Sequence, residues 1–217
     1  MAHQPHLLSG LYVILDPSVR PDRPLSNVLT AAAAGGAKLF QYRNKMAAMK
    51  DAYAEAFPLR NQARKLGVLF IVNDRCDLAM AIDADGVHLG QDDLPYADAR
   101  KLLGPHKVIG LSTHHSEQVK AASQLQPDYL GFGPIFKPAS KLIHDPVVGI
   151  EGLKQIRPLT ALPIFAIGGI GWDQVRPVMQ AGANGVAVIS AALNVQDVTQ
   201  AVGKLIGQMT RPVSPGA

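Results

Sequence analysis

Short apolar runs alternate with longer stretches of helical periodicity along most of the chain. The runs are rich in Val, Ile, Leu and Phe, which is typical of parallel strands that are buried on both faces. Gly67 and Gly182 each follow a helical stretch directly, as a C-cap glycine does. The expected strands are 11–15, 38–42, 69–72, 86–89, 108–111, 129–132, 164–167 and 185–189. The expected helices are 25–34, 51–66, 76–82, 96–103, 116–125, 150–157, 172–181 and 195–209.

Eight strands that alternate with eight helices predict a single (β/α)₈ barrel of the α/β class, with its active site at the C-terminal ends of the strands. We expect the barrel to span residues 11–209, with an N-terminal extension at 1–10 and a C-terminal tail at 210–217. The alternative is an open doubly wound sheet, which usually has about five or six strands and a glycine-rich first turn. The first strand here ends in Asp16-Pro17-Ser18, without that glycine pattern, so the barrel is favoured.

Composition narrows the function classes. Apolar residues make up 47% of the 217 residues and charged residues 18%, which excludes a disordered chain. The net charge is +4, but the Lys and Arg residues are scattered, so an anionic small molecule is favoured over nucleic acid as the partner. Cys76 is the only cysteine, which excludes an intrachain disulfide. We find neither a signal peptide nor a membrane span and expect a cytoplasmic protein; a homo-oligomer is left open.

Polar residues gather at the ends of the strands where a barrel carries its site. They are Gln41, Arg43 and Lys45 after the second strand, Asn73 and Asp74 after the third, Gln91 to Asp93 after the fourth, Ser112 to His115 after the fifth, and Lys137, Ser140 and Lys141 after the sixth. The seventh strand ends in Gly168 and Gly169, and the eighth in Ile189 and Ser190. The opposite ends carry little beyond Gly, Ala, Pro and Asp. This concentration at one rim predicts a functional site.

The residue types suggest the chemistry of that site. Arg43, Lys45 and Lys141 are suited to phosphate oxygens. Asp74 and Asp93 are suited to Mg²⁺, which favours one or two carboxylates together with substrate phosphates. Together they predict a diphosphate site with Mg²⁺ as cofactor. The glycines of the seventh strand and the backbone amides after the eighth match the usual phosphate site of this fold, which predicts a second site for a monophosphate.

Each carboxylate and glycine also has a purely structural interpretation. Asp74 lies where a residue would cap the next helix, and Asp93 precedes Leu94-Pro95 in the same way. The pair Gly168-Gly169 could form only a turn. The prediction of a site therefore depends on the combination and on no single motif.

The histidines near this rim are ambiguous as well. His114 and His115 invite a zinc or general-base hypothesis, but no third ligand has metal-like spacing, so a polar role at the start of a helix is favoured. His88 follows Val87 within an apolar run and is interpreted as a packed barrel residue.

Taken together, several segments resemble the thiamine-phosphate synthase family over about residues 11–209. They are Leu-Tyr-Val-Ile-Leu-Asp (11–16), Phe-Gln-Tyr-Arg-Asn-Lys (40–45), Val-Asn-Asp-Arg-Cys-Asp-Leu-Ala (72–79), Ala-Asp-Gly-Val-His-Leu-Gly-Gln-Asp-Asp-Leu-Pro (84–95), Gly-Leu-Ser-Thr-His (110–114), Gly-Phe-Gly-Pro-Ile-Phe (131–136), Ala-Ile-Gly-Gly-Ile (166–170) and Gly-Val-Ala-Val-Ile-Ser (185–190). The resemblance implies a (β/α)₈ transferase that joins a pyrimidine diphosphate to a thiazole monophosphate. The implied products are thiamine monophosphate and pyrophosphate, and the diphosphate departs before the thiazole nitrogen attacks.

The resemblance also implies roles for individual residues. It assigns catalytic roles to Ser112, Lys141 and Arg43, and Mg²⁺ ligation to Asp74 and Asp93. The residues that it implies in substrate binding are Gln41, Tyr42, Arg43, Asn44, Lys45, Asn73, Ser112, Pro138, Ala139, Ser140, Lys141, Gly169, Ile189 and Ser190.

Two positions depart from the family pattern. Pro138 stands where the family has a threonine, which removes a hydroxyl from the expected thiazole-phosphate loop, and the neighbouring Lys137 could compensate with its charge. Asn44 replaces a common glutamate. Two alternative functions are a thiazole tautomerase and a barrel that binds thiamine precursors without catalysis. Neither needs the Mg²⁺ carboxylates and diphosphate cations, so the synthase is favoured.

Overall fold

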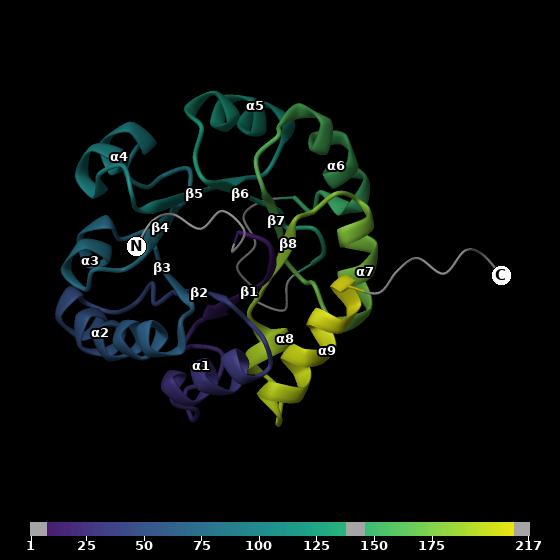
Figure 1. The fold of residues 1–217 in the computed structure, drawn as a ribbon. Helices are drawn as coiled ribbons and strands as arrows, with labels where there is room; N and C mark the ends of the chain where they lie inside the picture. Colours follow the sequence, from purple (N-terminus) through teal and green to yellow (C-terminus); the bar gives the residue numbers. More distant parts are fainter. Residues whose placement is uncertain (1–7, 138–145, 211–217) are drawn as a thin grey trace.

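Eight parallel strands form a closed barrel, and the helices surround it (Figure 1). The computed structural model describes residues 8–137 and 146–210. The strands are β1 (Gly10–Leu15), β2 (Leu39–Tyr42), β3 (Leu69–Asn73), β4 (Gly86–Leu89), β5 (Val108–Thr113), β6 (Tyr129–Phe132), β7 (Ile164–Ile167) and β8 (Gly185–Val188). The helices are α1 (Leu25–Ala34), α2 (Met49–Leu66), α3 (Cys76–Ala81), α4 (Tyr96–Leu103), α5 (Ser116–Leu125), α6 (Gly149–Ile156), the 3₁₀ helix η2 (Arg157–Leu159), α7 (Trp172–Gln180), α8 (Ser190–Leu193) and α9 (Val198–Thr210).

The predicted (β/α)₈ barrel is confirmed, and most predicted elements agree with the structure to within two residues. The chain after β8 differs. The prediction of one helix over 195–209 misses the short helix α8, which begins at the residue after Ile189. A new helix then starts near Asp197, whose side chain accepts a hydrogen bond from the Gln200 backbone N–H at 2.9 Å. That acidic residue caps α9 and separates it from α8.

Side chains inside the barrel form their own small core. Tyr12, Tyr129 and Phe165 are fully buried there and meet edge to face, with ring centroids 5.3–5.9 Å apart. Two interior glycines make room for these rings. A Cβ atom at Gly110 would lie 2.1 Å from Cζ of Tyr129, and one at Gly185 would lie 2.5 Å from Cε1 of Phe165. Packing inside the barrel therefore requires glycine at both positions.

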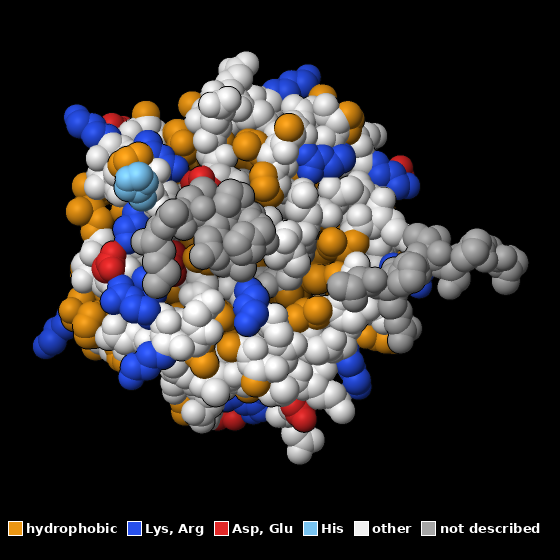
Figure 2. Space-filling model, in the orientation of Figure 1, with side chains coloured by type: hydrophobic (Ala, Val, Ile, Leu, Met, Phe, Trp, Pro, Cys, Tyr) orange, Lys and Arg blue, Asp and Glu red, His pale blue; other side chains and the backbone are white. Residues whose placement is uncertain are grey.

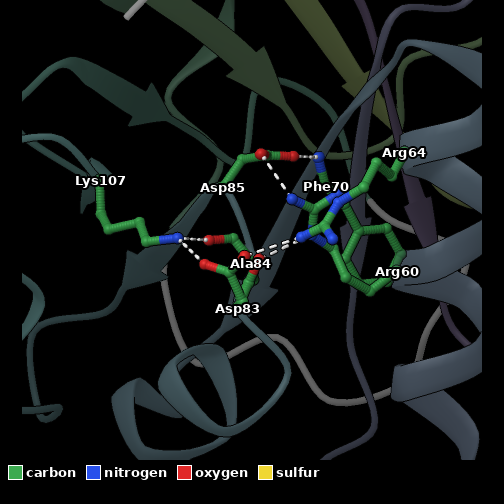
Figure 3. Close-up of polar contacts among 7 residues, drawn as sticks. All are labelled: Arg60, Arg64, Phe70, Asp83, Ala84, Asp85 and Lys107. Carbon is green, nitrogen blue, oxygen red and sulfur yellow. Dashed lines mark hydrogen bonds and ion pairs between the residues drawn. The ribbon is translucent and has the colours of Figure 1, made fainter. Parts of the chain in front are cut away.

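An arginine clamp closes the N-terminal rim at the start of β4. Asp85 directly precedes this strand. Its backbone N–H donates to the Phe70 carbonyl at 2.9 Å, and its Oδ2 accepts from the Phe70 N–H at 2.8 Å. Arg60, which is buried on α2, donates from Nη2 to Asp85 Oδ1 at 3.0 Å (Figure 3). The clamp thus joins a helix to two neighbouring strands.

The same clamp recurs before β6 and before β8. Asp128 accepts from the Ile109 N–H at 2.7 Å and from Arg100 of α4 at 2.9 Å. Asn184 accepts from the Ile164 N–H at 2.9 Å and from Arg157, which follows α6, at 3.0 Å. The corresponding position before β2 is Lys38. Three of the four pairs of βα units are therefore joined by one repeated device at the end of the barrel opposite the predicted site, so this rim carries more than the Gly, Ala, Pro and Asp that we expected there.

Surface charge is spread over separate groups. On the face shown in Figure 2, the Lys and Arg side chains form separate small groups, some near the centre of the face and others toward its edge, and they do not merge into one basic patch. This distribution agrees with the scattered cations of the sequence. Among the described residues, no helix combines the length and apolar content needed to cross a membrane.

The clamp yields a stability prediction. We expect Asp85→Ala to lower the free energy of unfolding by about 2–4 kcal/mol, because it leaves the buried guanidinium of Arg60 with only the Asp83 carbonyl oxygen as a partner and removes the acceptor of the Phe70 N–H. Asp85→Asn should cost less, because Asn184 makes the same backbone contact in the third clamp. Arg64→Ala is the matched control: it removes an exposed pair with Asp83, worth about 0–1 kcal/mol. Urea unfolding measures all three, and equal effects of Asp85→Ala and Arg64→Ala would contradict the prediction.

Candidate active site

An ion pair occupies the C-terminal ends of β1 and β2. Arg43, just past β2, donates from Nη1 to Oδ2 of Asp16, which is buried at the end of β1. The other oxygen of Asp16 accepts from the backbone N–H and the hydroxyl of Ser18, at 3.0 and 2.6 Å. The carboxylate is thus fixed on both sides and holds the guanidinium at the rim. Our sequence analysis missed Asp16 as a site residue, although an acidic residue directly after the first strand was the available signal.

Two carboxylates meet at the ends of β3 and β4. Asp74 follows β3 with a φ of +63°, and its backbone N–H donates to the His88 carbonyl at 2.8 Å. Asp93 accepts from the Gly90 N–H at 2.6 Å through Oδ2. Burial and the adjacent Asp93 raise the pKa of the Asp74 carboxyl, while Lys45, whose Nζ lies 3.2 Å from Asp74 Oδ2, opposes this rise. The structure therefore brings together the two residues that the sequence analysis assigned to Mg²⁺.

The chemistry of this pair fits a hard divalent cation. Mg²⁺ is commonly held by one or two carboxylates, with water and substrate phosphates completing its shell. Over residues 8–137 and 146–210, no group of three or more His, Cys, Asp or Glu side chains is placed to hold a metal. The negative charges of Asp74 and Asp93 repel each other unless a cation lies nearby, and the single positive charge of Lys45 offsets only part of this repulsion. Asp74 and Asp93 thus suit a metal that arrives with its own phosphate ligands.

A chain of hydrogen bonds crosses the barrel interior beneath the rim. Gln41 Nε2 donates to the Tyr12 hydroxyl at 2.8 Å, and the hydroxyls of Tyr12 and Tyr129 lie 2.9 Å apart. His88 Nδ1 lies 3.0 Å from the Tyr129 hydroxyl, and His88 Nε2 lies 2.8 Å from Ser112 Oγ. His88 is packed inside the barrel, as we expected, but it also links Tyr129 to Ser112. Two predicted substrate-binding residues, Gln41 and Ser112, are therefore connected through buried groups.

The other half of the rim is described only in part. The backbone N–H of Phe136 donates to the Gly168 carbonyl at 3.0 Å, and a Cβ atom at Gly169 would lie 2.6 Å from the Lys137 carbonyl oxygen. The two glycines thus hold the segment that leaves β6. Ile189 lies against the interior core, and the exposed Ser190 begins α8. The remaining predicted residues of this half lie outside the described residues; they are Pro138, Ala139, Ser140 and Lys141.

Two predicted substrate-binding side chains, those of Tyr42 and Asn44, do not join the other predicted site residues at the rim. Tyr42 is buried on the outer side of the barrel wall, where its hydroxyl donates to Glu55 Oε2 of α2 at 2.6 Å. Asn44 donates to the same oxygen at 3.1 Å. Alternation along β2 explains this, because Gln41 faces the interior and its neighbour must face the helices. Glu55 therefore ties this end of β2 to α2.

The two histidines after β5 lie at the start of α5. The backbone N–H of His114 donates to Oε1 of Gln118 at 2.8 Å, and its Nδ1 lies 2.7 Å from the Gly133 carbonyl oxygen. His115 directly precedes α5, and its Nδ1 lies 2.9 Å from Glu117 Oε2. These contacts agree with the polar role at the start of a helix that the sequence favoured.

Comparison with known proteins places this arrangement in context. The chain matches a family model described as thiamine monophosphate synthase over residues 11–192. It is 45% identical to a thiamine-phosphate synthase of Chloroflexus aurantiacus over 195 residues, which cover 90% of each chain. A thiamine-phosphate synthase of Moorella thermoacetica is 41% identical over 201 residues, covering 93% of this chain and 96% of the relative.

Solved structures extend the comparison. A thiamine phosphate pyrophosphorylase from Pyrococcus furiosus superposes with a TM-score of 0.85 at 36% identity, covering 95% of this chain and 98% of that one. A (S)-3-O-geranylgeranylglyceryl phosphate synthase from Thermoplasma acidophilum superposes with a TM-score of 0.73 at 14% identity, covering 96% of this chain and 98% of that one. At that identity the second similarity concerns the fold alone.

The interior histidine yields a pH prediction. Burial lowers the pKa of His88 from 6.5 to about 4, although the charge of Asp93 opposes the shift. Above pH 6.5 the ring is neutral in both the folded and unfolded chains, so the full stability is present. As the pH falls from 6.5 to 4, the unfolded chain takes up the proton first and stability is lost, on the order of 1–2 kcal/mol by pH 5.

Urea unfolding of the wild type and His88→Gln across pH 4–8 measures this contribution as the difference between their slopes. His106→Gln, at an exposed histidine, is the matched control and should leave the slope unchanged. A wild-type slope equal to that of His88→Gln would contradict the prediction.

Proposed function

Because the chain belongs to the thiamine monophosphate synthase family, we propose that its C-terminal rim joins a pyrimidine diphosphate to a thiazole monophosphate. The protein is a transferase with thiamine-phosphate synthase activity. The substrates are 4-amino-2-methyl-5-pyrimidinylmethyl diphosphate and 4-methyl-5-(2-phosphoethyl)thiazole, and the products are thiamine monophosphate and pyrophosphate. The observation that carries the proposal is the adjacent Asp74–Asp93 pair with Lys45 beside it at the rim.

The first half of the reaction is departure of the diphosphate. The bond between the pyrimidine methylene carbon and the diphosphate oxygen breaks, and its electron pair leaves with the oxygen. Arg43, held by Asp16, and Lys45 supply positive charge toward that anion, and Lys141 is assigned to the same role by family resemblance. Asp74 and Asp93 would hold Mg²⁺, which supplies charge neutralisation of the diphosphate when it is bound.

The second half is attack by the thiazole nitrogen on the methylene carbon. The nitrogen supplies the electron pair of the new C–N bond, so the reaction needs no nucleophile from the protein. The protein positions the two substrates and excludes competing water. We assign the thiazole phosphate to Ser140, Gly169, Ile189 and Ser190, with Lys137 as a nearby cation. Gln41, Asn73 and Ser112 are assigned to the pyrimidine diphosphate.

The two alternative functions need fewer of the charged residues at this rim. A thiazole tautomerase moves a proton within one monophosphate and has no use for paired carboxylates or for the Arg43–Asp16 pair. A barrel that only binds precursors has no need to neutralise a leaving group. Release of pyrophosphate by the purified chain, with each substrate and Mg²⁺ omitted in turn, separates the three. Binding of the thiazole phosphate without any Mg²⁺-dependent affinity for the pyrimidine diphosphate would overturn the synthase proposal.

Substitution of the carboxylates tests the metal site. Asp74→Asn and Asp93→Asn should each lower kcat at least about 10-fold and raise the Mg²⁺ concentration that gives half-activity, because each removes one anionic ligand. Asparagine tolerates the positive φ at position 74 and can accept the Gly90 N–H at position 93, so folding should be preserved. Asp92→Asn, at an exposed neighbour, is the control. An unchanged Mg²⁺ response in both site variants would reduce these residues to structural roles.

Substitution of the ion pair tests the diphosphate contact. Arg43→Ala should lower kcat/KM for the pyrimidine diphosphate by about 10- to 100-fold, the effect of a charged contact of roughly 1.5–3 kcal/mol. Asp16→Asn should show a smaller loss, because the guanidinium remains but is held less firmly. The KM of the thiazole phosphate should change little in both variants. Arg20→Ala, which removes an exposed pair with Asp22, serves as the control. A thiazole KM that rises as much as that of the diphosphate would contradict this division of the site.

A further inference from the structure

The buried hydrogen-bond chain defines which of its atoms donate. The amide nitrogen of Gln41 donates to the Tyr12 oxygen, so this oxygen is an acceptor in that contact. The hydroxyl proton of Tyr12 then has one remaining partner, the oxygen of Tyr129. The hydroxyl proton of Tyr129 in turn must go to its other neighbour, Nδ1 of His88. Each buried hydroxyl along the described chain is satisfied by this order.

This order determines the tautomer of the histidine. With Nδ1 acting as an acceptor, the ring proton is on Nε2, and Nε2 donates to Ser112 Oγ across 2.8 Å. The Ser112 oxygen already accepts one hydrogen bond from below, so its own proton is left for an acceptor in the site above. The ring is also fixed sterically, because a Cβ atom at Gly131 would lie 3.0 Å from Cε1 of His88.

We propose that His88 is a positioning residue that holds the Ser112 hydroxyl as a hydrogen-bond donor to the departing diphosphate. The inference rests on the proposed function, because it names the leaving group as the acceptor. Negative charge grows on the diphosphate oxygen as the carbon–oxygen bond breaks, and a donor already aimed at that oxygen needs no reorientation during the step. Tyr129 and Tyr12 connect His88 by hydrogen bonds to Gln41, another residue assigned to this substrate. The orientation of the Gln41 amide therefore sets the direction of the hydrogen bonds that reach His88.

Nitrogen NMR of the histidine ring tests the hydrogen-bond order without any turnover. In protein labelled with ¹⁵N-histidine, His88 should give the pattern of a neutral ring protonated on Nε2 between pH 6 and 8, with the signal assigned by its loss in His88→Gln. Tyr129→Phe keeps the ring packed against Gly110 but removes the donor to Nδ1. We expect this variant to show a mixture of the two tautomers. A wild-type ring protonated on Nδ1 would overturn the proposal.

Kinetics test the consequence for Ser112. Tyr129→Phe should lower kcat by about 3- to 10-fold, the effect of one neutral hydrogen bond, with the KM of the pyrimidine diphosphate within about 2-fold of wild type. In a Ser112→Ala background the same change should have no further effect on kcat, because the group that it orients is absent. Tyr53→Phe, which removes an exposed hydroxyl on α2, is the matched control.

A conservative rescue separates positioning from packing. His88→Gln can still donate from its amide nitrogen and accept through its oxygen, so it should retain more kcat than His88→Leu at comparable stability. Equal losses in both variants, or an undiminished effect of Tyr129→Phe in the Ser112→Ala background, would overturn the positioning role. A wild-type chain with the expected tautomer but no pyrophosphate release would overturn the proposed function while the hydrogen-bond order stands.

Discussion

Space inside the barrel is the constraint on which the site depends. Tyr12, Tyr129 and Phe165 fill the interior, and the rings fit only because Gly110 and Gly185 carry no side chain. Two of these rings, those of Tyr12 and Tyr129, also carry hydroxyls, which need hydrogen-bond partners in a region without solvent. The two hydroxyls bond to each other and to the side chains of Gln41 and His88 above them. The packing of the core therefore also sets the orientation of the site residues.

The two rims of the barrel divide stability and chemistry between them. At the N-terminal rim, charged and amide side chains satisfy each other in the repeated clamps of Asp85, Asp128 and Asn184. At the C-terminal rim, the carboxylates of Asp74 and Asp93 face each other, and only part of their charge is compensated. Within the proposed function, this costly arrangement of charges lies where the substrate binds, and the clamps that stabilise the fold lie at the opposite rim.

Within the proposed function, the charges at the rim and the hydroxyls beneath it act on the same departing anion from different sides. Arg43 and Lys45 provide long-range attraction from the surface, where solvent weakens each contact. Ser112 provides a single directed hydrogen bond from the interior, where the surroundings are less polar and orientation is fixed. The pair of Asp16 and Arg43 combines both features, since the buried carboxylate, held by Ser18, fixes a guanidinium that remains partly exposed.

The sequence by itself determined the eight βα units and the rim on which the polar residues gather, because periodicity and the residue after each strand are local properties. It also identified Asp74 and Asp93 as a pair, since successive parallel strands end side by side. It placed Tyr42 and Asn44 in the site, whereas alternation along β2 turns them toward Glu55. Only the tertiary structure brought Tyr12, Gln41, His88, Ser112 and Tyr129 into one chain, because closure of the barrel joins interior residues from strands that are distant along the sequence.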